Sequence, residues 1–359
     1  ISRSIIFELQ PLTADNIKTL IYRAVNDAEK GMGVYNAIID DEAVVEQPVI
    51  NEEAGTIVFA VNEEVESLKF TPIIEISEGA TITPASGVAQ DFSNNKKVTY
   101  TVTAEDGTVK VYTAFVEGTR KVLKYSFEDW KEGSKNDELL PKDLWAGSAA
   151  GAGILGGTLL RKETREDGTY AAKLITFEYP NEPNSLVPKI TAGSIFIGKF
   201  DMMPALQGDR LSCTKFGLDA ETVSLGGKPL CFKGVYKYES GSNYLDASNY
   251  EDVKPVDIKD KGQIQAVLYK VQTGEDGKEI VLTGHDVNTS ELRVAVANII
   301  VEDIKEYTPF NIEFEYLQEY DRNAKYKFAI VCSSSKDGDL FKGAGGSTLI
   351  VDEFEVICE

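Results

Sequence analysis

The alternation of apolar and polar side chains over residues 97–116 constrains the fold more than any other feature of the sequence. Residues 97–104 alternate with a period of two, the Glu-Asp-Gly segment at 105–107 supplies turn residues, and residues 108–116 alternate again. Such a period is typical of strands with one buried face, and a turn between two of them predicts a hairpin. We therefore expect antiparallel sheets.

Two more short strands are predicted before this hairpin, at residues 56–61 and 73–76, with turn-rich segments between them. Short strands at this spacing are typical of a β-sandwich. Further upstream, Asp15 and a helical spacing of apolar residues predict a helix over residues 15–29, with an irregularly flanked strand as the alternative.

A polar segment at residues 117–120 leads into a second strand-rich region. Its strand candidates are residues 122–128, 170–178, 194–200, 232–238, 264–271, 310–316, 326–332 and 347–356. Their number, and the lack of strand–helix alternation, fit a jelly roll or a related two-sheet sandwich with long loops. A chain of 359 residues predicts about two domains. We therefore expect two all-β sandwich domains, at residues 1–118 and 119–359.

The net charge of −21 argues against phosphate backbones and anionic membrane surfaces as partners, because like charges repel. No run of 18 apolar residues occurs, so we expect no membrane-spanning helix. The sequence begins at Ile1 rather than Met, so a signal peptide or lipid anchor upstream stays open.

The histidine and cysteine content excludes several catalytic classes. The sequence has one histidine, His285, in a turn-like segment. A zinc hydrolase needs two or three imidazoles, and a residue in such a loop is a poor candidate for the base of a serine triad. The four cysteines, Cys213, Cys231, Cys332 and Cys358, form no C-x-x-C pair. They lie in or beside apolar runs, which favours free thiols over two disulfides.

Residues 151–156 match the G-x-G-x-x-G pattern of dinucleotide-binding proteins. That site needs a buried strand before the glycines and a helix after them, and the flanking sequence predicts neither. We expect the glycines to let a long loop pack tightly against a sheet.

Paired carboxylates that could hydrolyse a glycosidic bond are abundant in so acidic a chain, and adjacency in sequence is no evidence for a pair in one cleft. A glycoside hydrolase therefore stays an alternative, with Asp252, Asp257 and Asp339 as unranked candidates. We assign no catalytic residue.

Aromatic side chains in polar, loop-like surroundings are the candidates for sugar binding: Trp130, Trp145, Tyr236, Tyr238, Tyr244 and Tyr250. A pyranose can stack its C–H face on such a ring while its hydroxyls form hydrogen bonds. The alternative is that the tryptophans close the ends of a sandwich core.

Acidic residues also occur on the first and last predicted strands of the second region. If these strands lie close together, Glu128 and Asp352 could share a structural calcium ion, which prefers oxygen ligands. Otherwise they are charges on edge strands that oppose aggregation. No other cofactor is expected.

The second region resembles the putative carbohydrate metabolism domain (PCMD) family. The segments that carry the resemblance are YSFEDW (125–130), AGSIFIGKF (192–200), FKGVYKY (232–238), YKFAIVCSSSKDGD (326–339), GAGGSTL (343–349) and VDEF (351–354). The first region is similar to bacterial immunoglobulin-like domains through SEGATITPASG (77–87) and VTYTVTAEDG (98–107). The resemblance implies a jelly roll akin to carbohydrate-binding modules, in an exported or surface lipoprotein that takes part in polysaccharide use.

The sequence thus predicts a glycan-binding domain on an immunoglobulin-like spacer, at the outer membrane surface or in the periplasm, with no chemistry of its own. Glycoside hydrolysis is one alternative. A structural or adhesin subunit that binds protein through a sheet edge is another.

Overall fold

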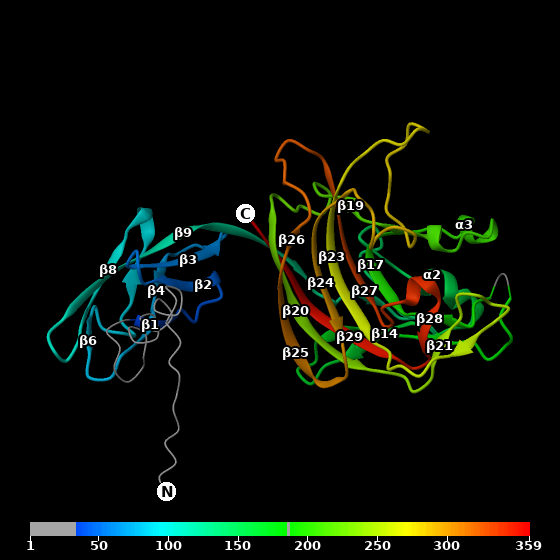
Figure 1. The fold of residues 1–359 in the computed structure, drawn as a ribbon, viewed down its shortest axis with the longest axis horizontal. Coiled ribbons are helices and arrows are strands. Elements are labelled where there is room, and N and C mark those ends of the chain that lie inside the picture. Colours follow the sequence, from blue (N-terminus) through cyan, green and yellow to red (C-terminus); the bar gives the residue numbers. More distant parts are fainter. Residues whose placement is uncertain (1–33, 185–186) are drawn as a thin grey trace, which may run out of the picture. The chain divides into compact units, whose positions relative to one another are not determined.

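The computed structural model describes residues 34–184 and 187–359, which fall into two compact units divided between Lys121 and Val122 (Figure 1). The sequence predicted the division after residue 118. The predicted helix at residues 15–29 lies outside the described residues. Within the described residues, strands are the main regular structure of both units and the helices are limited to single turns, which confirms the all-β prediction.

From residue 34 onward, where the structure describes it, the first unit contains nine strands and one short 3-10 helix. They are β1 (Val34–Ile38), β2 (Val44–Asn51), β3 (Thr56–Asn62), β4 (Lys69–Phe70), β5 (Ile73–Ile76), β6 (Thr81–Thr83), β7 (Gln90–Asp91), η1 (Ser93–Asn95), β8 (Val98–Thr103) and β9 (Val109–Tyr125), whose last residues belong to the second unit. Strands β8 and β9 form the predicted hairpin, with Val98 opposite Ala114. Strand β3 pairs with β9 in parallel. The unit's core is an aromatic and aliphatic cluster that includes Phe59, Phe70 and Phe92.

The second unit has twenty further strands among its described residues, which leave out 185–186. They are β10 (Trp130–Lys131), β11 (Glu138–Leu139), β12 (Trp145–Gly147), β13 (Leu160–Thr164), β14 (Tyr170–Ile175), β15 (Phe177–Glu178), β16 (Ile190–Thr191), β17 (Ser194–Phe200), β18 (Thr214–Phe216), β19 (Leu218–Asp219), β20 (Pro229–Glu239), β21 (Tyr244–Asp246), β22 (Lys254–Pro255), β23 (Gly262–Lys270), β24 (Arg293–Val301), β25 (Ile304–Glu313), β26 (Glu315–Tyr316), β27 (Tyr326–Ser333), β28 (Lys342–Ala344) and β29 (Thr348–Cys358).

Its helices are single turns: α2 (Ala149–Ala152), η2 (Gly153–Leu155), α3 (Met203–Leu206), η3 (Leu211–Cys213) and η4 (Gly338–Leu340). In the described part of the chain, none of the helices has the length and apolar character needed to cross a bilayer.

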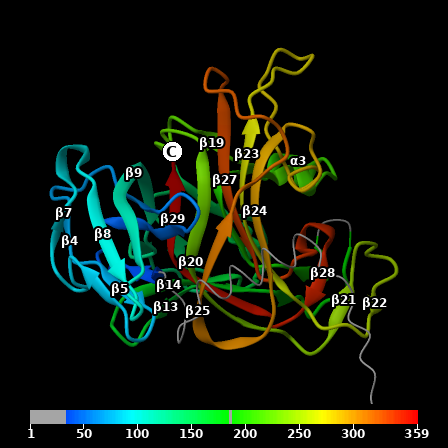
Figure 2. The ribbon, with the colours of Figure 1, turned by 60° about the vertical axis from the view of Figure 1, so that its left-hand side comes forward.

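Two antiparallel sheets pack face to face in this unit as a jelly-roll sandwich (Figure 2). We call the sheet with the order β12-β17-β27-β23-β24-β26 the covered sheet, and the sheet with the order β13-β14-β29-β20-β25 the charged sheet. Between them lies one continuous core, in which Phe127, Phe232 and Phe354 make edge-to-face contacts.

The covered sheet is buried on its outer face as well, the face turned away from the other sheet. Along β23, Ile264, Ala266 and Leu268 point into the sandwich core, whereas Val267 and Tyr269 belong to a separate cluster on the outer face. An apolar outer face is stable only where other parts of the chain shield it from water. Chain segments before and after α3 and η3, and residues 282–292, provide the cover.

Candidate functional site

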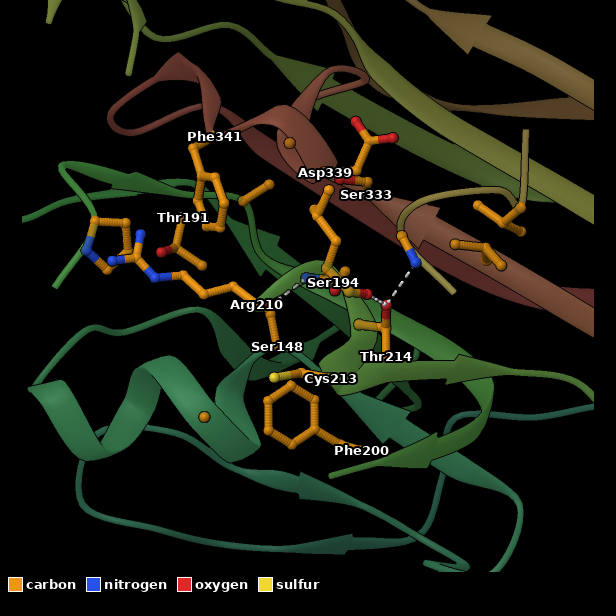
Figure 3. A pocket seen from close by; sticks show the side chains of 18 of the residues that line it. Ser148, Thr191, Ser194, Phe200, Arg210, Cys213, Thr214, Ser333, Asp339 and Phe341 are labelled. Atoms are coloured by element: carbon orange, nitrogen blue, oxygen red, sulfur yellow. Dashed lines mark hydrogen bonds between the residues drawn. The ribbon is translucent and has the colours of Figure 1, made fainter. Parts of the chain in front are cut away.

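A cavity of about 340 Å³ lies where these segments cross the outer face of the covered sheet (Figure 3). Its floor includes Ser194, Ser333 and Gln263, which stand directly opposite one another on the neighbouring strands β17, β27 and β23. In the next row, Gln265 lies opposite Val331. The floor therefore has one polar row beside a mixed one.

The wall formed by α2 and η2 depends on a glycine. A Cβ atom added to Gly151 would lie 2.5 Å from the ring of Phe200, closer than any real contact allows. This confirms, at Gly151, that the glycine-rich segment packs tightly against the end of a strand. The three-residue β12 before it and the four-residue α2 are not the buried strand and long helix of a dinucleotide site.

Arg210 reaches into the cavity from the segment before η3 (Figure 3). Its guanidinium carbon lies 5.3 Å from the ring centroid of Phe341, a cation–π arrangement, and its Nη2 donates to the Asn184 carbonyl at 2.9 Å. Burial lowers the pKa of Arg210. Phe341 has φ +56°, a strained conformation for a bulky residue of the kind found at binding sites.

Asp339 contributes the one carboxylate among the described residues that line the cavity. Burial raises the pKa of this carboxyl, and the neighbouring charge of Asp337 raises it further. Of the other two hydrolase candidates, Asp252 is exposed and paired with Lys254 at 2.5 Å, and Asp257 is exposed. The structure does not bring the three candidates together as a catalytic pair.

Three of the predicted sugar-binding aromatics are buried: Trp145, Tyr238 and Tyr244. Trp145 packs against Tyr125 and Phe127 inside the sandwich, with 5% of its surface exposed. The prediction that these rings face solvent is therefore wrong. β12 pairs with β17 in a register that turns the indole inward, which sequence alone did not reveal.

Trp130 and Tyr236 are half-buried and also pack against the sandwich core. The Trp130 Nε1 donates to the Phe127 carbonyl at 2.5 Å, and the Tyr236 ring lies 6.3 Å from that of Phe310. Neither residue lines the cavity. Trp130 and Trp145 thus fit the alternative of tryptophans that complete a core.

Tyr250 is the predicted aromatic that remains accessible, with 40% of its surface exposed. Its loop adjoins the cavity, because the Ala247 amide of the same loop donates to the carbonyl of the lining residue Phe341 at 3.2 Å. Tyr250 therefore presents a ring to solvent beside the cavity.

Two of the buried tyrosines hold a segment of the site in place by hydrogen bonds. Tyr238 donates to the Ser334 carbonyl at 3.0 Å, and Tyr244 donates to Asp337 Oδ2 at 2.9 Å. Both bonds anchor the segment between β27 and β28, which carries Asp339. Their role is positioning rather than stacking.

The same segment is held by a buried carboxylate, Asp260. Its Oδ2 accepts hydrogen bonds from the hydroxyls of Ser335 and Ser347 at 2.6 and 2.7 Å and from the Ala344 amide at 2.8 Å. This network explains why serines and glycines crowd the C-terminal part of the sequence.

The two residues predicted to hold calcium already have other partners. Asp352 Oδ2 lies 2.5 Å from Arg165, and Glu128 accepts the Tyr170 amide at 3.1 Å. Within residues 34–184 and 187–359, no group of three or more potential metal ligands gathers. The residues do not fit a calcium site, because a guanidinium takes the cation's position. Asp352 is not an edge charge either, since β29 lies between β14 and β20.

Sequence reasoning missed four cavity residues that matter most here: Arg210, Gln263, Gln265 and Phe341. The glutamines carried a usable signal, because two polar residues with a period of two interrupt an otherwise apolar strand. Arg210 and Phe341 carried none, since they come from separate loops that meet only in the fold.

Two of the solved structures that are similar to this chain align with well over half of it. One is a putative glycoside hydrolase from Bacteroides thetaiotaomicron VPI-5482, 29% identical, with a TM-score of 0.56 over 93% of this chain and 98% of that chain. The other is a putative glycoside hydrolase from Bacteroides vulgatus ATCC 8482, 28% identical, with a TM-score of 0.54 over 66% of this chain and 98% of that chain.

A shorter match is local. Over 43 residues, 12% of the chain, the sequence is 49% identical to part of Replication-associated recombination protein A of Bacillus subtilis (strain 168). The match spans about a tenth of that curated relative's length, 10%, and covers too little of either chain to bear on function.

Two family models match the chain. One described as "SGBP, N-terminal" matches residues 37–116, within the first unit. One described as "Putative carbohydrate metabolism domain" matches residues 104–357. Because this second match spans well over half of the sequence, the chain belongs to the putative carbohydrate metabolism domain (PCMD) family.

Proposed function

We propose that this protein binds a carbohydrate in the cavity of its second unit and holds it without hydrolysing it. The observation that carries the proposal is the mixed surface of the cavity, in which the polar row of Ser194, Ser333 and Gln263 lies beside apolar walls. Saccharides need both kinds of contact, hydrogen bonds for their hydroxyls and apolar contact for their C–H faces. A volume of about 340 Å³ suits a small ligand or one end of a chain.

Individual residues would then have separate tasks. Tyr250 offers a ring for stacking beside the cavity. Arg210 donates hydrogen bonds from a position supported by Phe341. Gln265, whose Nε2 donates to Asn288 Oδ1 at 3.1 Å, fixes the edge of the floor.

The family description and the match of the first unit to "SGBP, N-terminal" support a role in carbohydrate capture. The second match also supports a location at the cell surface. We further propose that the first unit is an immunoglobulin-like spacer and that a lipid anchor lies upstream of it. An adhesin role would instead require protein binding by the first unit.

Glycoside hydrolysis is the second candidate, and two observations favour it. The two similar solved structures are named putative glycoside hydrolases, and a carboxyl whose pKa is raised by burial, as in Asp339, suits a general acid. Carboxylate-pair hydrolysis needs a second group about 5–10 Å away. The described lining of the cavity contains Asp339 alone, which favours binding.

A glycan array with the full chain tests the proposal, followed by titration calorimetry on the best glycan. We expect Tyr250→Ala to weaken binding about two- to tenfold, as loss of one stacked ring does. Arg210→Gln should weaken it as well. The matched control is Arg322→Gln, since Arg322 is exposed and pairs with Glu359 outside the cavity.

Reducing-sugar release separates the two candidates. No release from a bound oligosaccharide supports capture. If sugar is released by the wild type but not by Asp339→Asn, hydrolysis rather than capture is the function. If Tyr250→Ala and Arg210→Gln both leave the affinity unchanged, the cavity takes part in neither function.

A further inference from the structure

We infer that the carbohydrate bound here carries an apolar substituent, an acyl, aryl or alkyl group, which lies against the α2–α3–η3 side of the cavity. The inference rests on the proposed carbohydrate-binding function and specifies its ligand class.

The α2–α3–η3 side presents a largely apolar wall, which Ser148, Arg210 and Thr214 interrupt. Phe200 and Met202 lie against Gly151, and the buried free thiol of Cys213 lies beside them. Burial raises the pKa of this thiol, which keeps the Cys213 side chain neutral. In Figure 3, Phe200 and Cys213 occupy the side of the cavity opposite Asp339 and Phe341.

Large apolar side chains also project into solvent around the cavity. Ile154 and Leu206 line the cavity with 74% and 66% of their surfaces exposed, and Leu155 is exposed next to them. Met203 and Leu340, each adjacent in sequence to a lining residue, are exposed too. Isolated exposed apolar residues are ordinary, whereas a group from three separate segments around one cavity indicates an apolar ligand surface.

An unsubstituted saccharide is a poor chemical match for this apolar wall. Its hydroxyls would lose water against Phe200, Met202 and Ile154 without gaining hydrogen-bond partners, which costs free energy. A saccharide with an apolar group can place its hydroxyls on the Ser194–Ser333–Gln263 row and the group on the wall. The two chemistries of the ligand then match the two sides of the cavity.

Matched glycosides test the inference directly. Methyl and octyl glycosides of a panel of common sugars are titrated into the full chain below the micelle-forming concentration, with octan-1-ol alone as a third probe. Each methylene that becomes buried strengthens binding about fourfold. We expect at least one octyl glycoside to bind tenfold or more tightly than its methyl partner, and more tightly than octan-1-ol.

The double variant Ile154→Ser/Leu206→Ser should abolish this preference, and since both residues are largely exposed, the fold should be retained. The matched control is Leu317→Ser, because Leu317 is 47% exposed and lies outside the cavity. A preference that survives the double variant, or is lost equally in the control, overturns the inference.

The remaining outcomes distinguish the inference from the proposed function. Equal affinity for methyl and octyl glycosides, or binding of unsubstituted glycans alone, overturns the inference of an apolar substituent. Either result leaves the proposed carbohydrate binding intact. If octan-1-ol binds as tightly as the octyl glycosides, the sugar contributes nothing to binding, and the inference of a substituted carbohydrate is overturned. No binding to any saccharide, substituted or not, defeats both proposals.

Discussion

The two sheets of the second unit have outer faces of opposite character. The charged sheet carries Lys173, Lys237 and Asp352 on its outer face, and the Lys237 ammonium and Arg165 guanidinium both lie over the Tyr307 ring. The covered sheet carries mainly apolar, amide and hydroxyl side chains instead, and its one ion-paired lysine among the described strands, Lys327, lies opposite Tyr269 and pairs with Asp219 and Glu279. Charges that pair with one another need no further cover, whereas an apolar face does. The cover, built from several loops, is what creates a cavity.

The largest effect is expected on the charged sheet, from Arg165→Met. This variant leaves the buried Asp352 carboxylate unpaired, which should cost about 3–5 kcal/mol in the free energy of unfolding. Denaturation followed by tryptophan fluorescence measures the second unit, because Trp130 and Trp145 both belong to it and the sequence has two tryptophans.

Arg165→Met/Asp352→Leu should recover much of this loss, since it removes the buried charge as well. Arg322→Met, which breaks an exposed ion pair, should cost under about 1 kcal/mol. If Arg165→Met were no more destabilising than Arg322→Met, the charged face would not be held by its ion pair.

On the covered sheet, Gly151→Ala should cost about 1–3 kcal/mol, because the added methyl overlaps the Phe200 ring. Alanine's better helix propensity would offset part of this. The shifted ring should also weaken binding of octyl glycosides. Gly274→Ala is the control, since its Cβ would meet a flexible Asp276 carboxylate at 3.2 Å. Equal stability of the two variants would show that the wall is not tightly packed.

A smaller effect is expected in the pH dependence of stability, through Asp339. Because burial raises its pKa in the folded protein, the folded state holds this proton more tightly than the unfolded chain does. Its contribution to the free energy of unfolding is therefore full below the usual carboxyl pKa and declines as pH rises through the raised value.

Denaturation of wild type and Asp339→Asn from pH 3.5 upward measures that contribution as a difference between the two. The wild type should lose stability relative to the variant as pH rises. Asp257→Asn, at an exposed carboxyl outside the cavity, is the control. Parallel curves for wild type and Asp339→Asn would count against a raised carboxyl pKa at this position.

The smallest effect is expected from Lys173→Ala on the charged sheet. The pair between Lys173 Nζ and Glu163 Oε2 spans 3.1 Å and is partly exposed, so its loss should cost about 0.2–1 kcal/mol. A loss comparable to that of Arg165→Met would mean that the whole charged face acts as one network, and double-mutant cycles would then apportion it.

The strands were largely predictable from sequence. Strand β17 coincides with the predicted residues 194–200, and the β8–β9 hairpin lies where the alternation predicted it. Strand β24 was missed, although its sequence is a run of apolar residues, because such a run has no period of two.

The site was far less predictable. Of the six aromatic candidates, Tyr250 is exposed on a loop beside the cavity, and Trp145 is in the core. Polar neighbours in sequence suggested exposure for both, yet a residue's exposure depends on the register of its strand and on which loops cover it.

The sequence by itself determined the two all-β units, the hairpin, and the tight packing of the Gly151 segment, because alternation and glycine act within a few neighbouring residues. The tertiary structure alone decided which aromatics are buried, that Arg165 rather than a metal neutralises Asp352, and that Arg210, Gln263 and Phe341 meet in one cavity. These are contacts between residues tens to nearly two hundred positions apart, and no local pattern records them.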